Sequence, residues 1–235
     1  MNQYELLDQM IDDAALMVFD VQDAARTAFA DMDWVADLGA SGASTYSYAS
    51  PDGRRASFRP HYLGVYTEDT GEWTWSWDSA NINTDALEVA TALREFGRNH
   101  GVDVLGDHAT STNPSFPLRL AMVAAAHSGI FHANAGAASK GTAWFLLSDA
   151  QGFRLPAPTP VSVANALANA ARGKCITSTA WALAAYAQRR EGLEWVDEGT
   201  TGTFTTPTGR VVVTFDALGR AGTLDLPDGL GDGQG

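Results

Sequence analysis

The sequence has few of the residues that several common classes of protein require. It contains one cysteine, Cys175, so no internal disulfide can form. Its 15 Lys and Arg residues are outnumbered by 28 Asp and Glu residues, which gives a formal net charge of -13. Phosphate backbones and anionic membrane surfaces attract clustered basic residues. We therefore expect neither nucleic acid nor membrane as a partner.

Long apolar segments are also missing. The most apolar stretch, residues 118–131, is interrupted by His127 and Gly129, whereas a membrane-spanning helix needs about 20 predominantly apolar residues. The first residues are acidic and contain no basic segment followed by an apolar one, so we expect no secretory signal peptide. A soluble cytoplasmic protein is the expectation that follows.

The motifs of familiar enzymes are absent from the sequence. It has no Gly-x-Ser-x-Gly nucleophile motif, no Gly-x-x-x-x-Gly-Lys phosphate loop and no His-Glu-x-x-His zinc motif. Separate structural or surface roles are therefore expected for the histidines, which are His61, His100, His108, His127 and His132. We expect no metal ion and no cofactor, and the sequence leaves open whether the protein is an enzyme.

The clearest positive feature is a segment in which three tryptophans alternate with polar residues, Glu72-Trp73-Thr74-Trp75-Ser76-Trp77-Asp78. Alternate residues of an extended strand share one face. Residues 72–78, here called the Trp segment, are therefore predicted to form a strand with an aromatic face and a polar face. Each indole can bury about 200 Å². The aromatic face is either part of the core or an open platform for a ring, a sugar or a peptide side chain.

Hydrophobic periodicity and turn residues outline the other elements. Helices are predicted at residues 2–32, 84–100, 117–128, 160–172 and 177–190. Strands are predicted at residues 45–49, 54–66, 72–78, 130–135, 142–148, 199–206, 210–216 and 222–226. Residues 102–116 are predicted to be a polar loop. This order predicts an α+β fold in which helices flank antiparallel sheets and a C-terminal β-meander ends the chain.

We predict a single domain over residues 1–226 and a disordered tail at residues 227–235, which are rich in Gly and Asp. An internal duplication is an open alternative, because at one common offset His61 aligns with His132 and Trp73 with Trp144. The duplication would give two related strand–strand–helix lobes, at residues 40–105 and 117–190. The other interpretation is that α+β proteins generally contain such units.

With the Trp segment placed, the sequence resembles a known protein family. The shared features are Leu63-Gly64, the turn Glu68-Asp69-Thr70-Gly71 and the alternating Trp73, Trp75 and Trp77. Two further segments are similar to family motifs, Leu93-Arg94-Glu95-Phe96-Gly97 and Phe215-Asp216-Ala217-Leu218-Gly219-Arg220. The family is bacterial, frequent in actinobacteria and described only as a domain of unknown function. The resemblance spans roughly residues 15–226 and implies a shared fold and layout, with no activity to transfer.

The Trp segment and the polar residues after it are the best candidate site. We predict that the ligand-binding residues are Trp73, Trp75, Trp77, Asp78, Asn81 and His61. The chain departs from the family pattern here, because Ser79 occupies a position where family members typically have Asn.

Three hypotheses for the function follow from this site and from the first helix. The leading one is a non-enzymatic module that binds a small molecule or a protein through the aromatic surface, with a homodimer left open. The alternative is an undescribed enzyme whose acid–base residue is Asp78, His61 or His132. A third hypothesis makes the acidic first helix, with its long apolar stripe, a docking or dimerisation element.

Overall fold

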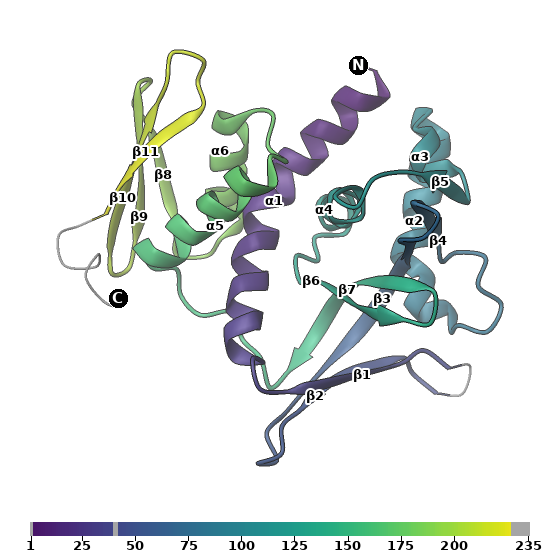
Figure 1. The fold of residues 1–235 in the computed structure, drawn as a ribbon. Coiled ribbons are helices and arrows are strands. Elements are labelled where there is room, and N and C mark those ends of the chain that lie inside the picture. Colours follow the sequence, from purple (N-terminus) through teal and green to yellow (C-terminus); the bar gives the residue numbers. More distant parts are fainter. Residues whose placement is uncertain (1, 40–41, 227–235) are drawn as a thin grey trace.

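The computed structural model describes residues 2–39 and 42–226 and has an α+β fold (Figure 1). Helices flank two antiparallel sheets, the second of which ends the described chain, so the predicted fold class is confirmed. The predicted tail, residues 227–235, lies outside the described residues. None of the described helices is both long enough and apolar enough to cross a membrane.

The helices are α1 (Gln3–Ala28), α2 (Thr84–His100), α3 (Asp103–Gly106), α4 (Phe116–Ser128), α5 (Pro160–Gly173) and α6 (Thr179–Arg189). The strands of the first sheet are β1 (Asp33–Asp37), β2 (Thr45–Ala49), β3 (Arg55–Thr67), β4 (Glu72–Trp75), β5 (Ala109–Ser111), β6 (Ala133–Ala138) and β7 (Gly141–Gln151). The strands of the second sheet are β8 (Glu194–Asp197), β9 (Thr201–Thr206), β10 (Gly209–Phe215) and β11 (Ala221–Asp225).

The long strand β3 organises the first sheet. One edge of β3 pairs with β2 near its start and with β4 near its end, and the other edge pairs with β7. The sheet continues from β2 to β1, from β4 to β5 and from β7 to β6, always antiparallel. The second sheet is a meander in the order β11-β10-β9-β8. The C-terminal β-meander predicted from the turns is therefore confirmed, with β8 as an additional strand.

α1 is the central helix of the molecule. It packs against α4 on the side of the first sheet and against α5 and α6 on the side of the second (Figure 1). A capping box starts it, because the Asn2 side chain accepts the N–H of Glu5 while the Glu5 carboxylate accepts the N–H of Asn2. Most apolar residues from Leu7 to Val21 are buried. α1 is thus part of the core, which leaves little of its apolar stripe for an external partner.

A buried carboxylate on α1 holds the start of α6. The Asp12 carboxylate accepts the backbone N–H groups of Thr177 and Ser178 and the hydroxyl of Thr177, each at 2.8 Å. The first N–H groups of a helix have no partner within the helix. Asp12 therefore accepts hydrogen bonds from N–H groups at the start of α6 that no carbonyl of the helix can accept. These bonds fix α6 against α1.

The predicted extent of the Trp strand and the predicted loop at residues 102–116 were wrong. The strand ends at Trp75, and on its polar side the buried Ser76 donates its hydroxyl to the carbonyl of Tyr62. Residues 102–116 hold α3 and β5 in place of a plain loop. Burial of Leu105 supports α3, and pairing with β4 supports β5, so tertiary contacts override the weak local pattern.

Candidate functional site

The tryptophans of the Trp segment lie in the interior. Trp73, Trp75 and Trp77 are 0%, 1% and 8% exposed. Trp73 and Trp75 meet edge to face with ring centroids 5.3 Å apart, and Trp77 stacks on Trp75 at 4.9 Å. Leu93 of α2 and Leu105 of α3 belong to the same core cluster. The aromatic face is therefore covered by the chain itself, and ligand contact by these rings stays a prediction.

Asp78 lies at the exposed end of the Trp segment. Its carboxylate pairs with Arg94 at 3.3 Å and lies 3.5 Å from the imidazole of His108. The Arg94 guanidinium lies 5.3 Å from the centroid of the Trp77 ring, which is a cation–π contact. Asn81 is exposed in the turn before α2. Asp78 and Asn81 are thus accessible, while the three indole rings and the third polar residue predicted for the site, His61, are buried.

The two histidines that a duplication would align have different surroundings. His61 is buried, its Nε2 lies 2.9 Å from the Ser148 hydroxyl, and burial lowers its pKa. The His132 ring packs edge-on against Phe58 at 5.0 Å, and burial lowers its pKa to about 4. No hydrogen bond joins the two imidazoles in the described part of the chain. The enzyme hypothesis calls for a histidine or carboxylate with a strongly shifted pKa in a cleft. His132 meets this description, because it lines a cavity and its pKa is lowered to about 4. Acid–base roles for His61 and Asp78 stay predictions.

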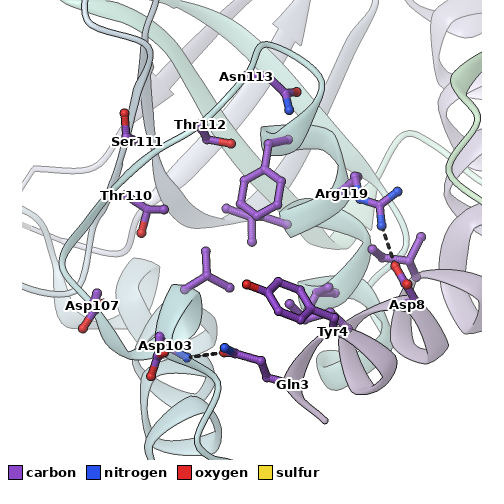
Figure 2. Close-up of a pocket in the computed structure, with 16 residues that line it drawn as sticks. Gln3, Tyr4, Asp8, Asp103, Asp107, Thr110, Ser111, Thr112, Asn113 and Arg119 are labelled. Carbon is purple, nitrogen blue, oxygen red and sulfur yellow. Dashed lines mark hydrogen bonds and ion pairs between the residues drawn. The ribbon is translucent and has the colours of Figure 1, made fainter.

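A cavity of about 640 Å³, here called the first cavity, opens between α1, the segment 103–113 and α4 (Figure 2). Small-molecule sites typically have volumes of about 300–1,000 Å³ and combine apolar walls with a few polar groups. The apolar lining residues are Leu7, Ile11, Val104, Phe116, Leu120 and Val123. Hydroxyl and amide groups are contributed by Gln3, Tyr4, Thr110, Ser111, Thr112 and Asn113.

Two contacts hold the start of α1 against the opposite walls of the first cavity. The side-chain carbonyl of Gln3 accepts the backbone N–H of Asp103 at 3.1 Å, and Arg119 of α4 donates to the Asp8 carboxylate at 2.6 Å (Figure 2). Tyr4 is 70% exposed, and its ring points from α1 toward the middle of the cavity. The first turns of α1 therefore form one wall, and Tyr4 stands at its opening.

Trp75 of the Trp segment is hydrogen-bonded to a residue that lines the first cavity. The indole N–H of Trp75 donates to the backbone carbonyl of Val104 at 2.9 Å, and Val104 lines the cavity. None of the six predicted site residues is among the described residues that line the cavity. Trp75 thus supports the wall of the cavity through Val104 without facing its interior.

The charges around the first cavity favour a neutral or cationic ligand group. Its described lining contains three carboxylates, from Asp8, Asp103 and Asp107, and one guanidinium, from Arg119, which is already paired with Asp8. An anionic group would meet two carboxylates that this guanidinium does not neutralise. No group of three or more His, Cys, Asp or Glu residues that could hold a metal ion occurs within residues 2–39 and 42–226.

Reasoning from the sequence missed the first cavity for a physical reason. The polar run Thr110-Ser111-Thr112-Asn113 before Phe116 has no periodicity and predicts only a loop. Its opposite wall, which includes Tyr4, comes from the first turn of α1. No periodicity within either segment indicates that the two lie together, so the run of hydroxyl and amide side chains is the only local signal.

Comparison with known protein families identifies the family of this chain. A family model, described as a family of unknown function (DUF6882), matches residues 8–150, which is more than half of the chain. The matched part runs from Asp8 in α1 into β7, and α5, α6 and the second sheet follow it. A search of curated proteins found no match, and neither did a search of solved structures. The chain therefore belongs to the family of unknown function DUF6882.

Proposed function

We propose that the protein is a binding module that takes a small organic molecule into the first cavity. The observation that carries the proposal is the composition of its walls, where six apolar side chains meet a row of hydroxyl and amide groups in about 640 Å³. Apolar side chains supply affinity through buried area, and a few polar groups supply orientation.

The proposed ligand has an apolar or aromatic body and a neutral or positively charged end. Leu7, Phe116 and Leu120 offer apolar and aromatic surface for the body. Asp107 and Thr110 lie on the polar side and can accept hydrogen bonds from an amine or a hydroxyl. The excess of carboxylates over guanidinium groups disfavours a ligand whose polar end is a carboxylate or a phosphate.

In this proposal the Trp segment has an indirect role. Trp75 holds the backbone of Val104 in place, so the aromatic cluster keeps one wall of the cavity rigid. A wall that is rigid before binding lowers the entropy lost when the ligand binds. Direct contacts of a partner with the exposed Asp78 and Asn81 stay predictions, as does a homodimer.

The compartment that we propose is the cytoplasm of a bacterium. The bacterial source rests on the family resemblance, and the compartment rests on cysteine usage. Cys175 is free and buried, and burial raises the pKa of its thiol. Disulfides are rare in reducing compartments such as the cytoplasm. A chain whose single thiol is buried and free is consistent with such a compartment.

Three probes that share a phenyl ring test the charge preference of the first cavity. They are 2-phenylethylamine, 2-phenylethanol and 3-phenylpropanoate, which present an ammonium, a hydroxyl and a carboxylate. Isothermal titration calorimetry should give the tightest binding for the amine and the weakest for the carboxylate. Exposed charge pairs are worth about 0.2–1 kcal/mol, so Asp107→Asn should weaken binding of the amine by about 1.4- to fivefold. Glu191→Gln, which removes an exposed carboxylate outside the cavity lining, is the matched control.

A second variant tests whether the polar row contacts the probe. Thr110→Val keeps the shape of the side chain and removes its hydroxyl, so it should weaken 2-phenylethanol without changing the melting temperature. The proposal fails if none of the three probes binds, or if the carboxylate binds as tightly as the amine. It also fails if neither Asp107→Asn nor Thr110→Val alters the binding of any probe.

A further inference from the structure

A second cavity, of about 450 Å³, lies at the other end of α1. Its aromatic lining consists of Phe29 just after α1, Trp34 of β1 and Tyr48 of β2. Phe29 stacks on Tyr48 with ring centroids 4.2 Å apart, and Trp34 stacks on Tyr46 at 5.2 Å. These stacked pairs hold the rings before any ligand arrives, so the aromatic wall is preorganised.

Two amide side chains in the second cavity each use only their donor. Gln22 donates its Nε2 to the carbonyl of Ala133 at 3.0 Å, and Asn134 donates its Nδ2 to the hydroxyl of Tyr46. Neither side-chain carbonyl oxygen accepts a hydrogen bond from any residue in the described part of the chain. Both residues line the cavity. Neither oxygen is among the buried side-chain atoms without a partner, so both are open to solvent and to a ligand in the cavity.

His132 adds a third polar atom without a partner. The residue is 7% exposed and lines the second cavity, and its Nδ1 is buried with no hydrogen-bond partner among residues 2–39 and 42–226. Burial lowers the pKa of His132 to about 4, so the ring is neutral near pH 7. With the proton on Nε2, a neutral imidazole presents a lone pair at Nδ1. Five buried side-chain nitrogens among the described residues have no partner, and of these only Nδ1 of His132 belongs to a residue that lines the second cavity. Because Nδ1 has almost no accessible surface, a ligand N–H reaches it only after a small shift of the cavity wall, and that contact would supply the missing partner.

We propose that the second cavity binds a planar heteroaromatic molecule that carries N–H donors. Its ring packs against Trp34 and Tyr48, and its N–H groups meet the acceptors of Gln22, Asn134 and His132. A hydrocarbon ring of the same shape cannot donate hydrogen bonds to these acceptors. The acceptors should therefore give a ligand with N–H donors a higher affinity than a hydrocarbon. This site shares no lining residue with the first cavity and does not depend on the function proposed for it.

Indole and benzofuran test this inference, because they have nearly the same shape and differ in that only indole has an N–H donor. Binding of each is measured by calorimetry and by the shift of the Trp34 indole N–H signal in NMR spectra. Indole should bind about tenfold more tightly than benzofuran, which corresponds to one well-placed hydrogen bond. His132→Phe keeps a flat ring among Phe58 and Phe153 and removes the Nδ1 acceptor.

Two further variants keep the test decisive. Gln22→Leu removes another acceptor and can be tested even if His132→Phe fails to fold. Because indole has a single N–H, its preference should fall in whichever of the two variants removes the acceptor that this N–H meets. Glu191→Gln, which lies outside the lining of both cavities, should leave binding of indole and the Trp34 signal unchanged. The inference is overturned if indole and benzofuran bind equally or if neither moves the Trp34 signal. It is also overturned if the folded variants at His132 and Gln22 both retain the full preference.

Discussion

The indole nitrogen of Trp75 lies 2.9 Å from the carbonyl oxygen of Val104 and donates a hydrogen bond to it. The other two indole nitrogens of the Trp segment, those of Trp73 and Trp77, are buried without a partner among the described residues. Trp75 is therefore the tryptophan whose polar atom is used, and the bond connects the core to a wall of the first cavity.

Replacing Trp75 by Phe tests this connection. The variant loses the indole N–H, leaves the Val104 carbonyl unpaired and opens a small void in the core. Together these effects should lower the free energy of unfolding by about 2–4 kcal/mol, and binding of 2-phenylethylamine in the first cavity should weaken. Urea unfolding and calorimetry measure the two effects. Trp181→Phe, at an exposed position on α6, is the control, with a change within about 0.5 kcal/mol. Equal stability of the two variants would contradict the role given to Trp75.

The buried ion pair between Asp20 of α1 and Arg190 gives a second prediction. Their side chains are 3% and 6% exposed, and the Arg190 Nε lies 2.6 Å from the Asp20 carboxylate. The Tyr186 hydroxyl also donates to Asp20, at 2.9 Å. Asp20→Asn leaves a buried guanidinium without its counter-charge, which should cost about 3–5 kcal/mol. The pair thus fastens the end of α6 to α1 and should be sensitive to loss of either partner.

A double-mutant cycle distinguishes this interaction from two independent effects. Asp20→Asn and Arg190→Met should each destabilise strongly, and the double variant should lose clearly less than the sum of the two. Asp23→Asn, which breaks the exposed pair of Asp23 with Arg26, should cost less than about 1 kcal/mol. Strict additivity of the two buried substitutions in urea unfolding would refute the coupling.

The pKa of His132 predicts how stability changes with pH. Burial lowers this pKa to about 4 in the folded protein, whereas a histidine in an unfolded chain titrates near 6.5. Between these values the unfolded chain binds a proton that the folded protein does not. The free energy of unfolding should therefore fall as the pH drops from about 6.5 to about 4, by about 3 kcal/mol, with no further loss from His132 below that.

The contribution of His132 is isolated by a difference between two proteins. Burial also lowers the pKa values of His61 and His127, so both add a slope of the same sign. Unfolding free energies of the wild type and of His132→Phe are therefore measured at several pH values between 4 and 7. The variant should lose less stability over this window. Parallel curves would show that His132 is not buried as a neutral ring.

Periodicity within a segment predicted the fold class and most elements. α2 begins at Thr84 and ends at His100, as predicted, because its apolar stripe is regular and Gly101 ends it in the left-handed region that favours glycine. The meander β9 to β11 was predicted from its turns to within two residues. The match to a family of unknown function agrees with the resemblance in one respect, because both place the chain in an uncharacterised domain family.

Features that depend on contacts between distant segments could not be predicted. β1 is a strand because it pairs with β2, although Asp33 and Asp37 at its ends disfavour a strand locally. Burial of the aromatic face of the Trp segment depends on helices that follow it, including Leu93 of α2. The two cavities likewise join opposite ends of α1 to segments far along the chain. The single domain and its related lobes stay predictions.

Gly64 of β3 gives the last prediction. A Cβ at this position would lie 2.8 Å from Cζ2 of Trp73 and would collide with the backbone carbonyl of Thr74 on the neighbouring strand. The obstacle is steric, because Gly64 is not among the residues of the described chain with a positive φ. Gly64→Ala should therefore push β4 away from β3 and lower the free energy of unfolding by about 1–3 kcal/mol.

Gly106→Ala is the matched control for Gly64→Ala. A Cβ at Gly106 meets nothing closer than Cγ of Arg98, 3.7 Å away, which is ordinary van der Waals contact. Alanine also favours a helix over glycine, so this variant should be neutral or slightly more stable. Because β4 carries Trp73 and Trp75, the strain in Gly64→Ala should also change near-UV circular dichroism, while Gly106→Ala leaves it unchanged. Equal urea midpoints and equal spectra for the two variants would mean that β3 and β4 have room to separate, and that the tight approach at Gly64 does not hold the Trp segment in place.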